Sequence, residues 1–280
     1  MKANAAANPI ITSRAIAAGR DWSMAEVVCR AGPRDAPYEE LHSHVSIAAV
    51  VSGTFSYRCD AGRALMYPGA LMLGNAGACF ECGHEHGAGD RCIAFHMSRP
   101  LFEEVAASAA GTGRFCFAAA TLPAMPALMP ALVEIEALAN GTKRLGAEQL
   151  TLRLAEQVAE TFAGQRAQAP APARGDERRI STALRHIEDN ADRTIDLDEL
   201  AALAHMSKYH FLRVFRRVTG TTPYKYLIDV RMRRAAVKLA TTREAVAAIA
   251  FDAGFGDLST FNSRFRAVFG QTPTQFRAGY

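Results

Sequence analysis

The sequence contains no apolar run long enough to span a membrane and no signal peptide, since Arg14 interrupts the only apolar stretch near its start. None of its six cysteines lies beyond residue 116. These absences argue against a membrane-spanning or exported protein, and we expect the reducing cytoplasm. Disulfides are rare in that compartment, so the cysteines need another explanation.

Motifs of the common enzyme classes are also missing. The chain has no Gly-x-Ser-x-Gly elbow, no glycine-rich phosphate-binding loop and no His-Glu-x-x-His motif. We therefore expect a protein that is not an enzyme.

One segment near the C-terminus is present twice, at an offset of fifty residues. The repeated positions are Phe211, Phe215, Arg216, Val218, Gly220, Thr222 and Pro223, which recur as Phe261, Phe265, Arg266, Val268, Gly270, Thr272 and Pro273. Phenylalanine at i and i+4 with valine at i+7 predicts a helix with one apolar face that ends at the glycine. The opposite face of each helix is polar and free for another role.

A shorter apolar segment and a turn precede each of these helices. The apolar segments are residues 197–204 and 246–251, and the turns are residues 205–207 and 254–257. Ser207 is placed to cap the first long helix, and Asp257 or Ser259 can cap the second. This order is the helix-turn-helix pattern, in which the second helix enters the DNA major groove.

Positive charge is concentrated at the same end of the chain. Residues 206–280 contain 13 lysines and arginines against 4 acidic residues, a net charge of +9, whereas residues 1–174 carry a net charge of −1. A local excess of this kind suits a polyanion, because neutralised phosphates release counterions on binding. An ordinary solvated helical surface is the alternative explanation.

On these motifs, residues 176–280 resemble the DNA-binding domain of the AraC/XylS-type bacterial transcription regulators. The second repeat matches at Ala250-x-x-x-Gly254-Phe255 and at Phe261-x-x-x-Phe265-x-x-x-Phe269-Gly270-x-x-Pro273-x-x-Phe276-Arg277. The first repeat matches at Leu200-Ala201, Ser207, Phe215, Gly220 and Pro223-x-x-Tyr226-Leu227, and Arg231-x-x-x-Ala235-x-x-x-Leu239 fits the family's linker helix. Phe276 departs from the pattern, since the family often has tyrosine there.

The resemblance implies two helix-turn-helix units joined by one helix, here from Pro223 to about Ala240. Eighteen helical residues span about 27 Å. A spacer of that length could place two recognition helices in successive major grooves, which lie about 34 Å apart.

Position on the two long helices predicts which side chains contact DNA. The predicted base contacts, near the N-terminal ends, are Tyr209, His210, Arg213, Ser259, Thr260, Asn262 and Ser263. Among them Arg213 is the strongest candidate, because a guanidinium reads guanine O6 and N7 together, and its repeat counterpart is the short Ser263. The predicted phosphate contacts are Lys208, Arg216, Arg217 and Arg266. For any one of these residues, a side chain that is merely exposed to solvent is the alternative.

Composition divides the chain into three parts. Residues 1–165 form a predicted sensor and dimerisation domain, residues 166–175 a linker rich in alanine, proline and glutamine, and residues 176–280 the DNA-binding domain. Residues 127–140 and 147–162 have helical periodicity. Such a pair is usually core packing, but in this family it often makes the dimer contact, so we expect a homodimer.

Residues 10–118 have the short alternating runs of a β-barrel or sandwich, for example at 45–51, 54–58 and 91–96. His42-x-His44, Gly53, Tyr67-Pro68-Gly69 and His84 resemble the small cupin-like barrel that many of these regulators use as a sensor. Ala48 and Ala49 stand where metal-binding cupins usually have a glutamate. The predicted fold class is α+β multidomain: a cupin-like β-barrel with a helical hairpin, then an all-α domain with two helix-turn-helix units.

The sensor segment carries a cluster with metal-ligand spacing, Cys79-x-x-Cys82-x-His84-x-His86. The candidate ligands, with two upstream histidines, are His42, His44, Cys79, Cys82, His84 and His86. Thiolate and imidazole ligands suit Zn²⁺ or another transition metal. The alternatives are cysteines that act as small buried hydrophobes, a redox-sensing thiolate, and a pocket for an organic effector.

Together these features predict a regulator that binds promoter DNA in a sequence-specific manner and responds to a small molecule or a metal. Its expected partners are double-stranded DNA, a second copy of the chain and, as a candidate, RNA polymerase. The alternative is a metal-dependent cupin enzyme fused to a DNA-binding domain, with Glu81 and Glu85 beside the metal.

Overall fold

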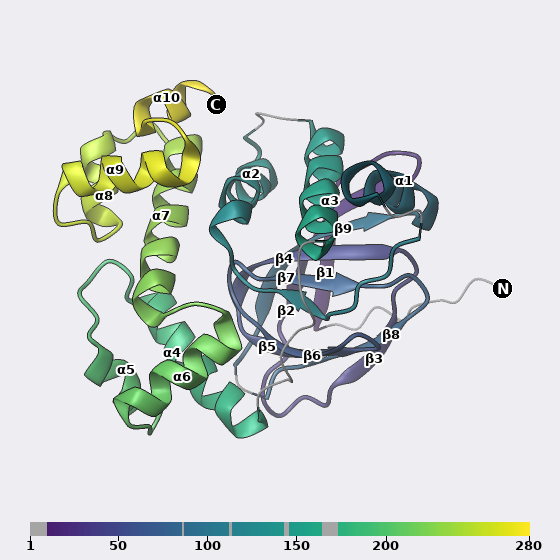
Figure 1. Cartoon of the computed structure of the whole chain (residues 1–280), viewed down its shortest axis with the longest axis horizontal. Helices are drawn as coiled ribbons and strands as arrows, with labels where there is room; N and C mark the ends of the chain where they lie inside the picture. The colour runs from purple at the N-terminus through teal and green to yellow at the C-terminus, as the bar shows by residue number, and fades with distance from the viewer. Residues whose placement is uncertain (1–9, 86, 112–113, 143–145, 164–172) are drawn as a thin grey trace.

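The computed structural model describes residues 10–85, 87–111, 114–142, 146–163 and 173–280. An N-terminal part built on antiparallel sheets lies beside a C-terminal part built of helices (Figure 1). The coarse division predicted from the sequence is therefore confirmed. No helix of the described residues combines the length and the apolar character that crossing a membrane requires.

Two antiparallel sheets form the N-terminal part. The strands are β1 (Ile11–Ala18), β2 (Trp22–Cys29), β3 (Tyr38–Leu41), β4 (Val45–Gly53), β5 (Phe55–Cys59), β6 (Gly62–Met66), β7 (Leu71–Gly74), β8 (Cys79–Gly83), β9 (Asp90–Met97) and β10 (Thr121–Leu122). The larger sheet has the order β1-β2-β9-β4-β7-β10 and the smaller sheet the order β3-β8-β5-β6. The strands predicted at 45–51, 54–58 and 91–96 are confirmed as β4, β5 and β9.

Alternation along β9 shows why both faces of the larger sheet are covered. Ile93 and Phe95 pack in a core with the helices that follow the sheet, whereas Cys92 and Ala94 belong to the core between the two sheets. Successive side chains of a strand point to opposite faces, so one strand serves two cores. The space between the sheets is therefore lined by alternate residues of several strands.

Three helices cover the outer face of the larger sheet (Figure 1). They are α1 (Arg99–Ala110), α2 (Met129–Ala139) and α3 (Ala147–Ala163), and a short 3₁₀ turn, η1 (Pro126–Leu128), leads into α2. The helices predicted at 127–140 and 147–162 are confirmed as α2 and α3. Helix α1 was not predicted, although Ser98 caps it through the Leu101 amide and Pro100 lies in its first turn.

The C-terminal part contains helices only. They are α4 (Arg174–Asp189), α5 (Leu197–Leu203), α6 (Lys208–Thr219), α7 (Pro223–Thr241), α8 (Val246–Asp252), α9 (Leu258–Phe269) and α10 (Pro273–Ala278). Residues 166–172 of the predicted linker lie outside the described residues, but Arg174 and Gly175 are already helical. The long helix predicted from Pro223 is confirmed as α7, with Thr222 as its N-cap.

The turns of the two repeats differ by one residue. Residues 204–207 separate α5 from α6, whereas residues 253–257 separate α8 from α9. Each turn needs a left-handed backbone, which His205 supplies with φ 50° in the first and Gly254 with φ 87° in the second. Glycine adopts that conformation without the steric cost that a side chain brings.

Substituting Gly254 tests how much the second turn depends on glycine. A Cβ at Gly254 would lie 2.7 Å from the Asp192 carbonyl oxygen and 2.8 Å from that of Ala191, beside the guanidinium of Arg231. Arg231 itself donates to the carbonyl oxygens of Ala191 and Gly254, so the backbone there is held in place.

We expect Gly254→Ala to lower the free energy of unfolding by at least about 1–2 kcal/mol, the cost of a left-handed non-glycine residue. Urea denaturation measures this. Gly256→Ala is the matched control, because a Cβ there meets no atom within 4 Å. Equal stability of the two variants would contradict the expectation.

The helical part is attached to the sheet part through two separate cores. Residues of α4 and α6, among them Ile180 and Phe215, share a core with Tyr57 and Tyr67 of the smaller sheet and the loop after it. Residues of α7 to α10 share another core with Val133 and Ala137 of α2. Helix α7 connects the two groups of helices and lies beside α2 (Figure 1).

Candidate nucleic-acid interface and inter-sheet pocket

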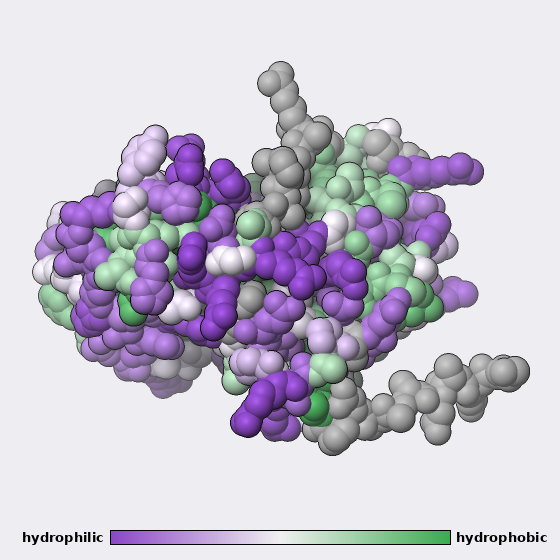
Figure 2. Space-filling model, turned by 90° about the horizontal axis from the view of Figure 1, so that it is seen from below, coloured by the Kyte–Doolittle hydropathy of each residue, from purple (hydrophilic) through white to green (hydrophobic). Residues whose placement is uncertain are grey.

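The outer face of α6 is polar and open to solvent. Phe211, Val214 and Phe215 are buried beneath it, and Ser207 caps the helix by accepting from the His210 amide at 3.4 Å. The predicted contacts Lys208, Tyr209, Arg213, Arg216 and Arg217 are exposed, and His210 is half-buried. Tyr209 is 80% exposed, so packing within the chain does not explain an aromatic residue at this position. Seen from below, most of the helical half of the molecule is hydrophilic, with small hydrophobic patches (Figure 2).

Few internal contacts hold the charged groups of this face. Lys208 Nζ lies 2.6 Å from Asp198 Oδ1 in an exposed pair, and Arg213 Nη2 donates to His210 Nδ1 at 3.1 Å. Among the described residues, the structure records no ion pair for Arg213, Arg216 or Arg217. Their guanidinium groups are thus available to an external anion.

Helix α9 has the same construction with smaller side chains. Phe261 and Phe265 are buried, while all five predicted contacts on the helix are exposed: Ser259, Thr260, Asn262, Ser263 and Arg266. Of the two candidate caps it is Asp257 that acts, accepting from the Thr260 amide at 2.7 Å. Backbone donors at this cap, Thr260 first, lower the pKa of Asp257.

A contact between α9 and α7 was not predicted. Arg264 Nη2 donates to the Tyr224 hydroxyl at 3.3 Å, and the guanidinium lies 6.0 Å from the centre of the tyrosine ring. Tyr224 is nevertheless 63% exposed at the start of α7. The repeat contains a signal for this pair, since Arg264 stands where the first copy has the buried Val214.

A cavity of about 210 Å³ lies between the two sheets and is lined by apolar groups with a few polar ones. His42, on the loop before β4, stacks on Phe80 with ring centres 4.0 Å apart, and its Nε2 lies 2.8 Å from the Tyr57 hydroxyl. Because that hydroxyl donates to the Leu73 carbonyl oxygen, His42 donates from Nε2. Burial, aided by His96, lowers the pKa of His42 to about 4, so the ring is neutral at pH 7. The cavity has the character of a site for a small, mainly apolar ligand.

The predicted metal ligands are spread over this part of the molecule rather than gathered. His42 contacts Tyr57, His44 is exposed beside Ser43, and His86 lies outside the described residues. Cys79 is exposed whereas Cys82 is buried, because residues three apart on a strand point to opposite faces. Among the described residues, no three of the predicted ligands bring their ligand atoms within 4.8 Å of one another.

His84 belongs to a different group. Its Nε2 lies 2.6 Å from Asp90 Oδ2, and the ligand atoms of Cys29, His84 and Asp90 all lie within 4.8 Å of one another. Burial on its own would lower the pKa of His84, but Asp90 and Cys29 outweigh it and raise the pKa to about 9. Neither Cys29 nor Asp90 was predicted.

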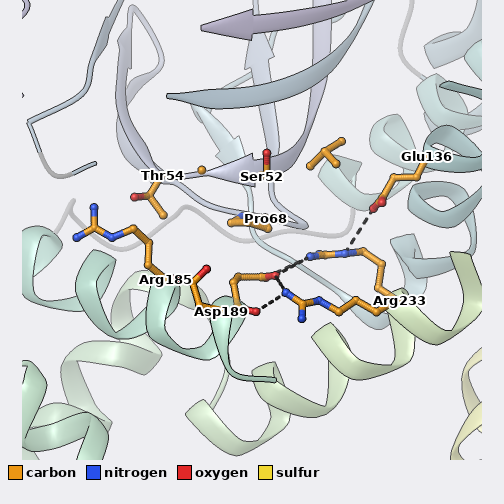
Figure 3. Close-up of a pocket in the computed structure, with 11 residues that line it drawn as sticks. Ser52, Thr54, Pro68, Glu136, Arg185, Asp189 and Arg233 are labelled. Carbon is orange, nitrogen blue, oxygen red and sulfur yellow. Dashed lines mark hydrogen bonds and ion pairs between the residues drawn. The ribbon is translucent and has the colours of Figure 1, made fainter. Parts of the chain in front are cut away.

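A second cavity, of about 310 Å³, lies between the sheet part and the helices (Figure 3). Arg233 of α7 crosses its floor and joins Glu136 of α2, at 3.5 Å, to Glu188 of α4, at 3.1 Å. The arginine is 6% exposed; burial disfavours its charge, but the two carboxylates outweigh burial and raise its pKa. This ion-pair network ties the two parts of the chain together.

Comparison with known proteins identifies the C-terminal part. Residues 200–279 match the family model of a helix-turn-helix domain. The Transposon Tn10 TetD protein of Escherichia coli is 36% identical over 98 residues, which are 35% of this chain and 71% of that protein. The regulatory protein SoxS of Salmonella typhimurium is 35% identical over 98 residues, 35% of this chain and 92% of that protein.

A solved structure is also similar in this region. It is the DNA-binding domain of the global transcriptional factor AdpA in complex with a target DNA, 31% identical, covering 36% of this chain and 91% of that chain with a TM-score of 0.35. SoxS is described as a regulatory protein. The relatives thus favour a regulator over the enzyme alternative.

Proposed function

The chain belongs to the AraC/XylS family of bacterial transcription regulators, and on this premise we propose that it binds promoter DNA sequence-specifically through α6 and α9. One observation carries the proposal: two helices present exposed polar faces at the two ends of a single connecting helix. The pairs α5–α6 and α8–α9 then act as two helix-turn-helix units. The 19 residues of α7 span about 28 Å, which is close to the 34 Å between successive major grooves.

Residues near the N-terminal ends of the two helices read bases in this proposal. Tyr209, His210 and Arg213 act from α6, and the short side chains of Ser259, Thr260, Asn262 and Ser263 act from α9. The remaining cations, Lys208, Arg216, Arg217 and Arg266, bind phosphates and fix the position of the protein on the duplex. Arg213 of the first unit carries a long guanidinium, whereas Ser263 at the equivalent position of the second unit carries a short hydroxyl. The first unit therefore discriminates bases more sharply than the second.

The two-sheet part serves as a cupin-like sensor in this proposal. A small ligand or a metal enters between the sheets, where the cavity near His42 offers space. Binding shifts the population between two arrangements of the helical part, provided that the ligand's affinity differs between them. The contacts of α7 with α2 and the Arg233 ion pairs support such a coupling, since they join the two parts directly.

Self-association and contact with RNA polymerase complete the proposal. Within the chain α7 packs on α2 and α1 packs on α3, so a homodimer contact has to use the outward side of these helices. The exposed side of α3 carries Glu148, Glu156 and Glu160.

Salt dependence of DNA binding tests the proposed interface. We expect the full-length chain to bind an operator, selected from random duplexes, more tightly than a shuffled duplex. Arg216→Ala should weaken binding to both duplexes by a similar factor and reduce the slope of log K against log salt by about 1, because one phosphate contact is lost. Fluorescence anisotropy at several salt concentrations measures both quantities.

The control variant is Arg178→Ala, which removes an exposed arginine of α4 that is not among the predicted DNA contacts. It should leave the affinity and the salt slope unchanged. A wild-type chain that binds both duplexes equally, without dependence on salt, would show that the proposed function is wrong.

A further inference from the structure

Three cysteines surround a histidine–aspartate pair at one end of the space between the sheets. Cys29, Cys82 and Cys92 are all buried, as are His84 and Asp90. All but His84 line the same cavity. None of this group is used in the proposed contacts with DNA.

Strand register explains why these residues meet. Cys29, the last residue of β2, pairs with Asp90, the first residue of β9. Asp90 and Cys92 lie two residues apart on β9 and so share a face. Cys82 lies on β8 of the opposing sheet, and His84 directly follows the last residue of that strand. Side chains from both sheets are therefore directed into one buried space.

Distances within the group bring nitrogen, oxygen and sulfur ligands together. His84 Nε2 lies 2.6 Å from Asp90 Oδ2, and with the thiol of Cys29 these ligand atoms all lie within 4.8 Å of one another. Cys92 lies beside this set, with its Sγ 3.4 Å from Asp90 Oδ1. With bonds of about 2.0–2.3 Å, the ligand atoms of a tetrahedral ion lie about 3.3–3.8 Å apart. His84 Nε2 and Asp90 Oδ2 therefore have to move apart to admit the ion, and Cys92 Sγ has to turn toward it.

Neighbouring groups orient the ligands. The His84 ring stacks on Phe55 with ring centres 5.7 Å apart. The backbone N–H of Ala31 donates to Cys29 Sγ at 3.4 Å, a contact that stabilises negative charge on the sulfur. An isolated His–Asp ion pair would account for two of the residues, but not for the Cys29 thiol that lies within 4.8 Å of both.

We propose that Cys29, His84, Asp90 and Cys92 bind a thiophilic divalent metal ion such as Zn²⁺. Cys29, Asp90 and Cys92 line the cavity between the sheets together with Cys82, so the ion can exchange through that cavity. This site differs from the ligand set predicted from the sequence and shares only His84 with it. Its role as the effector site of the sensor rests on the proposed function.

Cobalt substitution tests the site on the full-length chain. Protein purified under reducing conditions is stripped with a chelator, desalted and titrated with Co²⁺. We expect one Co²⁺ per chain, with a thiolate-to-cobalt charge-transfer band and the intense visible bands of tetrahedral coordination, and displacement of both by Zn²⁺. Cys29→Ser and the nearly isosteric Asp90→Asn should each weaken Co²⁺ binding by more than about tenfold.

Cys79→Ser and Cys116→Ser are the matched controls, because both cysteines are exposed and lie outside the group. They should keep the band and the affinity. Absence of the band from the reduced wild-type chain would overturn the proposal, as would a band that survives both Cys29→Ser and Asp90→Asn. A disulfide among Cys29, Cys82 and Cys92 in metal-free protein, detected by mass spectrometry, would also overturn it in favour of a thiol switch.

DNA binding measured on the same samples separates the two proposals. Salt-dependent operator binding by a wild-type chain that takes up no Co²⁺ would remove the metal site and leave the proposed function. Stoichiometric Co²⁺ in a chain that binds no operator would support the metal site and remove the proposed function. If metal is the effector, Zn²⁺ should shift the operator affinity of the wild type but not that of Asp90→Asn.

Discussion

Arg233→Met should lower the free energy of unfolding by about 3–5 kcal/mol, the cost of breaking a buried ion pair from one side. Methionine keeps the length of the side chain but removes the buried cation that the half-buried Glu136 and Glu188 share. Burial already raises the pKa of Glu136 despite the opposing effect of Arg233, so removing the arginine should raise it further. Urea denaturation followed by circular dichroism measures the loss.

Arg234→Met is the matched control for this experiment. The Arg234 side chain also contacts Glu188, at 3.3 Å, but it is 44% exposed, and exposed pairs contribute less than about 1 kcal/mol. Adding Glu136→Gln to Arg233→Met should recover part of the lost stability, because it removes the uncompensated negative charge. If Arg233→Met and Arg234→Met were equally stable, the buried network would not be what joins the two parts.

Arg213→Ala should weaken binding to the selected operator by about 1–3 kcal/mol, the range for one guanidinium that contacts a base edge. Binding to shuffled DNA should change much less, so the operator preference should fall with the affinity. Ser263→Ala, the change at the equivalent position of α9, should have a smaller effect, because a hydroxyl offers a single contact where a guanidinium offers two. Selection from random duplexes, repeated with each variant, identifies the base positions that lose their preference.

A phosphate contact contributes to binding of any DNA sequence, unlike a base contact. Arg216→Ala is therefore the informative comparison for Arg213→Ala. Its loss of affinity should be the same for operator and shuffled DNA. The assignment of base contacts would be wrong if Arg213→Ala and Ser263→Ala left both affinity and operator preference unchanged.

Local signals explain why the C-terminal helices could be predicted. Ser207 caps α6, Gly220 ends it in a left-handed conformation, and the fifty-residue repeat gives the same limits for α9. Each of these signals acts within a few residues, so it can be read from sequence alone. The one-residue difference between the two turns is not visible in the phenylalanine spacing, because it lies before the first phenylalanine of each repeat.

Long-range contacts explain what could not be predicted. Cys29 lies sixty-one residues before Asp90, and only the pairing of β2 with β9 brings the two together. The sequence grouped Cys79 with Cys82 because of their spacing, yet the strand sends them to opposite faces. The Arg233–Glu136 pair likewise depends on how α7 lies against α2, for which neither helix carries a local signal.

The attachment of the helical part through two separate cores has a mechanical consequence. A domain held at one place can swing about a single hinge, whereas here α4 and α6 are held by the smaller sheet while α7 to α10 are held by α2. Both of these cores belong to the same sheet-based part of the chain. Rotation of the helical part about one core alone would therefore break the packing at the other. The spacing of α6 and α9 along a duplex is therefore set by the body on which they rest as well as by the helix that connects them.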